Sequence, residues 1–147
     1  MTHPDTALRD RVDREELELS FATFTHDDAW RLGTAIRELA TARGLAVTID
    51  VHLGDQQVFH AALAGTSADN DDWISRKIRT VRRFGRPSMA IELDEGIHWL
   101  DETVYARAGG CVSIRVNGTM VGTATVSGLS SIDDHDLVIE GLRAIRT

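Results

Sequence analysis

Residues Gly109–Leu129 read GGCVSIRVNGTMVGTATVSGL, a pattern that predicts two strands joined by a tight turn. Apolar and polar residues alternate over 112–116, as in a strand with one buried face. Asn117-Gly118 then supplies the residue pair that a type I′ hairpin turn favours, and 119–126 returns as the partner strand. Because a hairpin pairs its strands antiparallel, this segment argues against a doubly wound parallel sheet.

An earlier segment has the same character and predicts a second hairpin. Residues 47–53 and 58–63 both alternate between apolar and polar side chains, and Gly54-Asp55-Gln56 separates them. A three-residue loop at this point puts both apolar sets on one side of the sheet. We therefore expect a sheet built from two hairpins.

The register of this hairpin carries a functional prediction. It pairs Asp50 with His60 and His52 with Val58, and it places Asp50, His52 and His60 on the face opposite the apolar strip. Two imidazoles and a carboxylate suit a divalent or iron centre, so these three residues are a candidate metal site. Their spacing matches no established metal motif, and hydrogen bonds within the sheet would satisfy the same side chains.

Helical periodicity surrounds the two hairpins. It predicts helices over 6–19, 27–43, 69–84 and 132–145, with shorter ones over 87–93 and 101–108. Thr25 is the expected N-cap of the second helix, Gly44 its stop, and Ser131 the cap of the last helix. The fold class expected is α+β, an antiparallel sheet with flanking helices. We expect residues 1–147 to form a single domain, with 1–20 as an N-terminal helical extension.

Composition limits the partners of the chain. The formal net charge is −7, which argues against nucleic acid or an anionic membrane as a general partner. Cys111 is the only cysteine, so neither an intramolecular disulfide nor a multi-cysteine metal site can form. Residues 1–13 lack the apolar stretch of a secretory signal, and no apolar run reaches the ~20 residues of a membrane span. These features predict a cytoplasmic protein.

The helix expected over 69–84 carries the only lysine of the chain. At about 100° per residue, Lys77 falls on the apolar face of this helix, between Trp73 and Val81. Its stem could pack over Trp73 while its ammonium pairs with a carboxylate, or it could project into a cavity or subunit boundary and meet an anion. An unpaired buried ammonium is costly, so either interpretation predicts a negatively charged partner.

Arginines surround this lysine and form the one basic cluster of an acidic chain. The cluster comprises Arg76, Arg79, Arg82, Arg83 and Arg86. It is either a solvated helix face or a site for carboxylate or phosphate groups, which arginine holds with two hydrogen bonds. We take as candidate ligand-binding residues Lys77, Arg76, Trp73 and Arg83. We take Trp73 and Arg79 as a candidate assembly surface.

Two of these stretches resemble a known superfamily. Residues 109–129 start with Gly-Gly, turn at a glycine and return with V-G-x-x-x-V-S-G, which resembles the haem-degrading superfamily of HbpS-like and GlcG-like proteins. Trp73-Ile74-x-Arg76-Lys77 is similar to a branch of small cytosolic proteins within it. The resemblance implies a profilin-like antiparallel sheet with flanking helices and homo-oligomers, often built from dimers. It also implies haem or a small metabolite as a ligand.

Three functions remain open at this point. The chain is a binding module for a small anionic ligand near Lys77 and Arg76, with haem as one candidate. Alternatively it is an enzyme that uses Lys77 as an acid, base or electrophile with a nearby histidine. In the third case the helix that carries Trp73 and Lys77 is a surface for assembly or for a partner protein.

Overall fold

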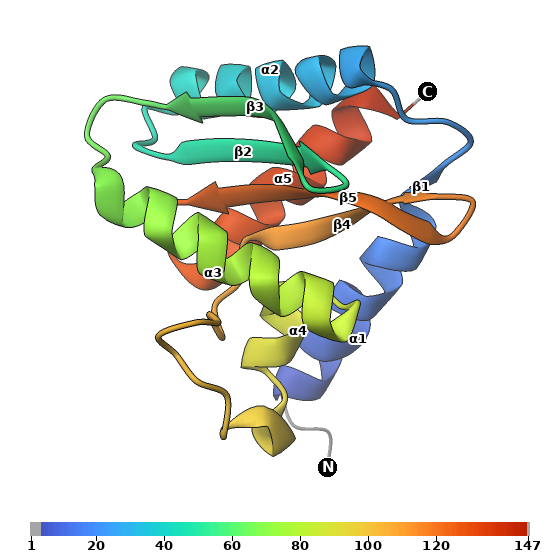
Figure 1. Cartoon of the computed structure of the whole chain (residues 1–147), viewed down its shortest axis with the longest axis vertical. Coiled ribbons are helices and arrows are strands. Elements are labelled where there is room, and N and C mark those ends of the chain that lie inside the picture. The colour runs from blue at the N-terminus through green and yellow to red at the C-terminus, as the bar shows by residue number, and fades with distance from the viewer. Residues whose placement is uncertain (1–3, 147) are drawn as a thin grey trace.

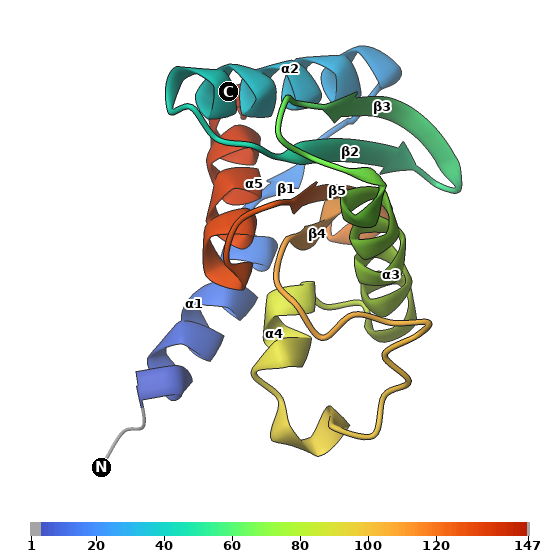
Figure 2. The same cartoon turned by 90° about the vertical axis from the view of Figure 1, so that its left-hand side faces the viewer.

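The computed structural model describes residues 4–146 and contains one five-stranded sheet between helices (Figures 1 and 2). The strand order is β1-β4-β5-β2-β3, and every neighbouring pair is antiparallel except β1 with β4. The bounds of the strands are β1 Ser20–Phe21, β2 Thr48–Leu53, β3 Gln56–Ala62, β4 Cys111–Val116 and β5 Thr119–Ser127. The expected α+β fold with two hairpins is confirmed, and β1 is an addition that the sequence did not indicate.

The long helices lie where periodicity placed them. Their bounds are α1 Pro4–Glu18, α2 His26–Ala42, α3 Ala68–Phe84, α4 Ser88–Glu92 and α5 Ser131–Ile145, with a short 3-10 helix η1 at Glu95–Ile97. Thr25 caps α2 through a capping box with Asp28, but the N-cap of α5 is Ser130 and the expected cap at Ser131 is wrong by one residue. None of these helices is long and apolar enough to cross a membrane.

The helix expected over 101–108 does not form. This segment runs as turns and extended chain. The carboxylate of Asp101 accepts hydrogen bonds from the backbone N–H of Thr103 at 3.0 Å and from its hydroxyl at 2.7 Å. A side chain that bonds to the nearby backbone in this way competes with the first turn of a helix.

The two faces of the sheet are covered by different helices (Figure 2). Helices α2 and α5 pack on one face and enclose the main core, in which Leu32, Ile36, Ile49 and Leu142 are almost inaccessible to solvent. Helix α2 approaches β3 closely because Gly33 has no side chain. A Cβ atom at this position would come within 2.3 Å of the Phe59 ring.

The β2–β3 hairpin has a tighter turn than expected. Asp50 faces His60, as predicted, but His52 faces Gln57 and the pairing with Val58 is wrong. The loop contains only two residues, and a bulge between Val51 and His52 restores the register towards the middle of the strands. This bulge brings Gln57 to the same face as Asp50.

Helix α3 covers the opposite face of the sheet and buries Lys77 there. The Lys77 side chain is 3 % exposed, and its Nζ atom donates to Asp134 Oδ2 at 3.1 Å and to the Val126 carbonyl at 2.9 Å. The negatively charged partner expected for this lysine is therefore present. One ammonium group joins α3 to the end of β5 and to the first turn of α5.

Burial opposes the charges of this pair. It lowers the pKa of Lys77 and raises the pKa of Asp134, while the attraction between the two groups acts against both shifts. A carboxyl group whose folded-state pKa is raised favours folding at low pH, and it loses that contribution as the pH rises through this pKa. The cation of Lys77 is therefore what makes a charged Asp134 tolerable at neutral pH.

Lys77→Met should destabilise the protein by about 3–5 kcal/mol at pH 7, because it leaves a buried carboxylate without its cation. The loss should become smaller as the pH is lowered from 7 to 5, because the raised pKa of Asp134 favours its protonation, which removes the unpaired charge. Urea unfolding at both pH values measures this difference. Arg37→Met, at an exposed position of α2, should change the free energy of unfolding by no more than about 0.5 kcal/mol. An equal loss at both pH values for Lys77→Met would show that the ion pair is not the cause.

Candidate functional site

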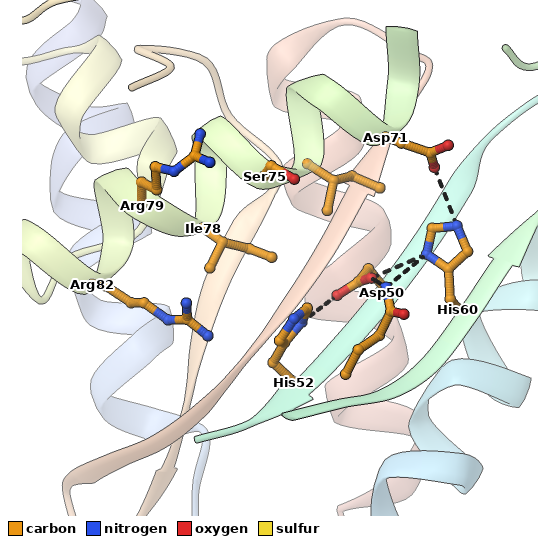
Figure 3. A pocket seen from close by; sticks show the side chains of 10 residues that line it. Asp50, His52, His60, Asp71, Ser75, Ile78, Arg79 and Arg82 are labelled. Carbon is orange, nitrogen blue, oxygen red and sulfur yellow. Dashed lines mark hydrogen bonds and ion pairs between the residues drawn. The ribbon is translucent and has the colours of Figure 1, made fainter. Parts of the chain in front are cut away.

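A pocket of about 500 Å³ lies between α3 and the β2–β3 hairpin (Figure 3). The hairpin contributes Asp50, His52, Gln57 and His60. Helix α3 contributes Asp71, Ile74, Ser75, Ile78, Arg79 and Arg82. The lining is mostly polar, and it joins a group of histidines on the sheet to arginines on the helix.

Asp50 forms the floor of this pocket and organises the polar groups around it. Its side chain is 1 % exposed, and its two oxygens contact Nδ1 of His52 at 2.5 Å and Nδ1 of His60 at 3.0 Å. Gln57 Nε2 also donates to this carboxylate at 2.6 Å. A buried carboxylate needs such partners, and in return it fixes the orientation of both imidazole rings.

The two histidines differ in what their second nitrogen contacts. Nε2 of His60 lies 3.1 Å from Asp71, so both nitrogens of this ring have a carboxylate partner. Nε2 of His52 has no hydrogen-bond partner within residues 4–146, and it is not among the buried unsatisfied atoms. His52 therefore presents a free ring nitrogen at the pocket that it lines.

The candidate metal ligands do come together on one face, as the alternation of the strand predicted. Asp50, His52 and His60 point towards one another, but the histidines direct their Nδ1 atoms at the two carboxylate oxygens rather than at a shared point (Figure 3). The metal site stays a prediction.

A different group has the convergence that a metal site needs. In the part of the chain that the structure describes, only Glu15, His135 and Asp136 bring three ligand atoms within 4.8 Å of one another. Arg11 lies among them, with Nη1 at 3.1 Å from Glu15 and 2.9 Å from Asp136. This guanidinium already supplies the positive charge that the carboxylates require.

Two arginines of α3 are among the residues that line the pocket, and they differ in direction. Arg82 Nη2 donates to the Gly54 carbonyl at 3.0 Å and lies 3.7 Å from the carboxylate of Asp55, which is 99 % exposed. Arg79 Nη1 donates to the Val104 carbonyl at 3.3 Å, and no described carboxylate lies within 4.0 Å of its guanidinium. Figure 3 shows Arg82 turned towards the strands and Arg79 turned away from them. Neither charge is neutralised by a buried acid.

The four residues that the sequence indicated as ligand-binding do not lie in the pocket beside the hairpin. Lys77 and Trp73 line another pocket, of about 450 Å³, beside the first turn of α5. Asp134 also lines this pocket and neutralises the lysine. Lys77 therefore reaches a cavity, but as half of an ion pair.

Arg76 and Arg83 are occupied by contacts within the chain. The guanidinium of Arg76 stacks on Trp73 at 4.0 Å from the ring centre and pairs with Asp72 at 2.9 Å. The guanidinium of Arg83 lies 5.0–5.5 Å from the centres of three aromatic rings, those of Phe84, Trp99 and Tyr105. The structure does not bring the four candidate residues into one site, and their role in ligand binding stays a prediction.

Sequence reasoning missed parts of the pocket that depend on tertiary structure. Gln57 enters through the bulge, for which the sequence carries no signal that we recognise. Ser75 and Arg82 were open to prediction, because residues seven apart lie on the same face of a helix. The sequence does not show that this face of α3 packs opposite the β2–β3 hairpin.

Relatives of known sequence match almost the whole chain. A UPF0303 protein of Streptomyces coelicolor is 42% identical over 150 residues, which cover 96% of this chain and 95% of the relative. A UPF0303 protein of Edwardsiella ictaluri is 44% identical over 139 residues, which cover 88% of each. These matches extend across both hairpins and all of the residues that line the pocket.

Solved structures share the fold. The Ybr137w protein has a TM-score of 0.84 at 31% identity, with 92% of this chain and 86% of that chain covered. A double mutant of Streptomyces reticuli HbpS has a TM-score of 0.73 at 20% identity, with 88% and 92% covered. The structure described as a PduOC:heme complex has a TM-score of 0.72 at 15% identity, with 85% and 96% covered.

A family model fits the chain over most of its length. The model is described as haem degrading protein HbpS-like, and it matches residues 24–143. This match spans α2 to α5 and so includes the whole sheet except β1. The chain belongs to the HbpS-like family of haem-degrading proteins.

Proposed function

We propose that the chain is a small-molecule-binding protein whose ligand is a small organic anion held between α3 and the β2–β3 hairpin. The observation that carries this proposal is the charge of the pocket. Arg82 of α3 reaches it without a buried carboxylate to neutralise its charge, whereas the acid on the floor of the pocket is fully engaged by histidine and glutamine side chains. Arginine recognises a carboxylate or phosphate through paired hydrogen bonds.

The size and position of the pocket agree with a small ligand. Its volume of about 500 Å³ falls within the range of ordinary small-molecule sites. Arg82 is 38 % exposed and is tied to the turn of the hairpin by one hydrogen bond and a long ion pair with Asp55, at 3.7 Å. An arriving carboxylate would replace this weak ion pair, and the cost of breaking it is small because exposed pairs contribute little.

The pocket beside Lys77 is less suited to an anion. Asp134 lies 3.1 Å from the ammonium and accepts a further hydrogen bond from the Leu129 N–H at 2.9 Å. A second negative group would approach this carboxylate as well as the lysine. We therefore move the proposed anion site from Lys77 to the other side of α3.

Haem does not fit the walls of the proposed pocket. A porphyrin needs mostly apolar surroundings, but Ile74 and Ile78 are the only large apolar residues in this lining. Asp50 and Asp71 would face the macrocycle, and both nitrogens of His60 are engaged by carboxylates. A small carboxylate matches the polar lining better than haem does.

Pyruvate serves as the probe for this proposal. Saturation-transfer NMR and calorimetry should show saturable binding, and Arg82→Gln should weaken it by about 10-fold or more, because a hydrogen bond to a charged group contributes ~1.5–3 kcal/mol. Arg37→Gln, on the exposed face of α2, is the matched control and should bind like the unmodified protein. A parallel titration with haemin should give no saturable Soret shift. Absence of carboxylate binding, or stoichiometric haemin binding in its place, would overturn the proposal.

A second candidate function is assembly into homo-oligomers. All three tryptophans are exposed, with exposed fractions of 63 % for Trp30, 41 % for Trp73 and 57 % for Trp99. Trp73 is covered on one side by the guanidinium of Arg76, and Arg79 is exposed one turn further along α3. Tryptophan and arginine are enriched at the centres of protein interfaces. The outer face of α3 is therefore the surface we propose for self-association.

Trp73→Ala should produce a smaller species, since it removes the largest side chain of this surface. Light scattering coupled to gel filtration gives the molar mass directly. Trp30→Ala is the matched control, because Trp30 lies on α2 and across the sheet from α3 (Figure 2). The same molar mass for both variants and for the unmodified chain would remove the proposed surface.

A further inference from the structure

We propose that His52 is a general base and that the pocket catalyses proton removal from the carbon next to the carbonyl group of a small 2-oxo acid. This inference rests on the proposed anion site and adds a reaction to it. The juxtaposition that supports it is an accessible imidazole nitrogen, oriented by a buried carboxylate, in a pocket that the guanidinium of Arg82 also reaches. The proposed reaction needs no metal ion bound to the histidines, and Lys77 has no role in it.

The pair of Asp50 and His52 has the geometry of a positioned base. The Nδ1 atom of His52 lies 2.5 Å from Asp50 Oδ1, and the carboxylate is 1 % exposed. A carboxylate acceptor places the ring proton on Nδ1, and the lone pair then resides on Nε2. The same relation between an acid and an imidazole fixes the tautomer and orientation of the histidine in a catalytic triad.

His60 shows why the base is His52. Both rings contact Asp50 through Nδ1, so they share the same orienting group. The Nε2 atom of His60 is engaged by Asp71 at 3.1 Å, whereas that of His52 has no partner among the described residues. The structure thus contains one free imidazole nitrogen and one occupied nitrogen around a single carboxylate.

The environment of His52 suits a substrate that becomes more negative during the reaction. Its side chain is 16 % exposed, so the base is recessed but open to the pocket. Arg82, which reaches the hairpin turn from α3, supplies a cation on the same side of the pocket (Figure 3). Fixed positive charge near a developing enolate lowers the energy of the transition state.

The proton transfer is balanced without any further reactant. The C–H bond next to the carbonyl group breaks, and its electrons form a carbon–carbon double bond while the carbonyl π electrons move to the oxygen. The proton forms a new bond to Nε2 of His52, and Asp50 stabilises the resulting imidazolium. Reversal returns a proton to carbon, and in D₂O it returns a deuteron because the protonated ring exchanges with solvent.

The experiment follows the methyl protons of pyruvate by ¹H NMR in D₂O. The intact chain should accelerate their loss above the rate in buffer, and His52→Gln should reduce the catalysed rate by about 10²–10⁴-fold, the usual contribution of a general base. His98→Gln is the matched control, because His98 is exposed and its one hydrogen bond to the described residues is with the Glu95 carbonyl. It should leave the rate unchanged. His52→Ala should regain exchange when imidazole is added, which separates loss of the base from loss of the fold.

Pyruvate binding is measured on the same samples, so that failure of each idea can be recognised. If the intact chain binds pyruvate but exchanges no protons above buffer, His52 is not a base and the anion site alone remains. Exchange that persists in folded His52→Gln likewise overturns the inference. If the intact chain does not bind pyruvate, the proposed function fails as well.

Discussion

The contact of Lys77 with Asp134 and Val126 fixes the position of α3, and most of the functional surface depends on that position. The ammonium bonds to the end of β5 and to the first turn of α5, and with the buried side chains of Ile74, Ile78 and Val81 it holds the rotation of the helix over the sheet. Gly110 leaves room for it, because a Cβ at that position would come within 2.7 Å of Nζ. With this rotation, Ser75 and Arg82 face the hairpin, while Trp73 and Arg76 face outward.

Sequence patterns predicted the parts of this arrangement that depend on local chemistry. Alternation placed Asp50 opposite His60, and helical periodicity placed Lys77 on the buried side of α3. Asn117-Gly118 marked the turn of the second hairpin, where both residues have positive φ angles. Each of these depends on neighbours within a few positions. A carboxylate partner for Lys77 could be expected from the cost of burying an ammonium, but its identity as Asp134, 57 residues away, could not.

Two of the failures, the missing β1 and the register of the first hairpin, depend on contacts that sequence spacing does not encode. The short strand β1 pairs with β4 next to the point where α1 is held against the sheet, because Glu16 of α1 accepts a hydrogen bond from Ser113 and lies 2.7 Å from Arg115. The bulge in the β2–β3 hairpin shifts one residue of β3 and so brings Gln57 to Asp50. The sequence could therefore predict that Asp50, His52 and His60 share one face, but not that Gln57 joins them or which ring nitrogen stays free.

Two charged groups contact α3 in different ways. The Lys77–Asp134 pair holds the helix in place, whereas the group around Asp50 lines a pocket. Lys77 and Asp134 neutralise one another, so the pair has no net charge with which to attract an anionic ligand. Around Asp50 each histidine uses only its Nδ1 atom on the carboxylate, and the Nε2 atom of His52 and the guanidinium of Arg82 remain at the surface of a cavity. Likeness to HbpS and PduOC at 15–20% identity shows the shared fold alone. We therefore derive the proposed activity from His52 Nε2 and the Arg82 guanidinium, because a ligand binds to polar groups whose hydrogen-bonding capacity is not fully used by partners within the chain.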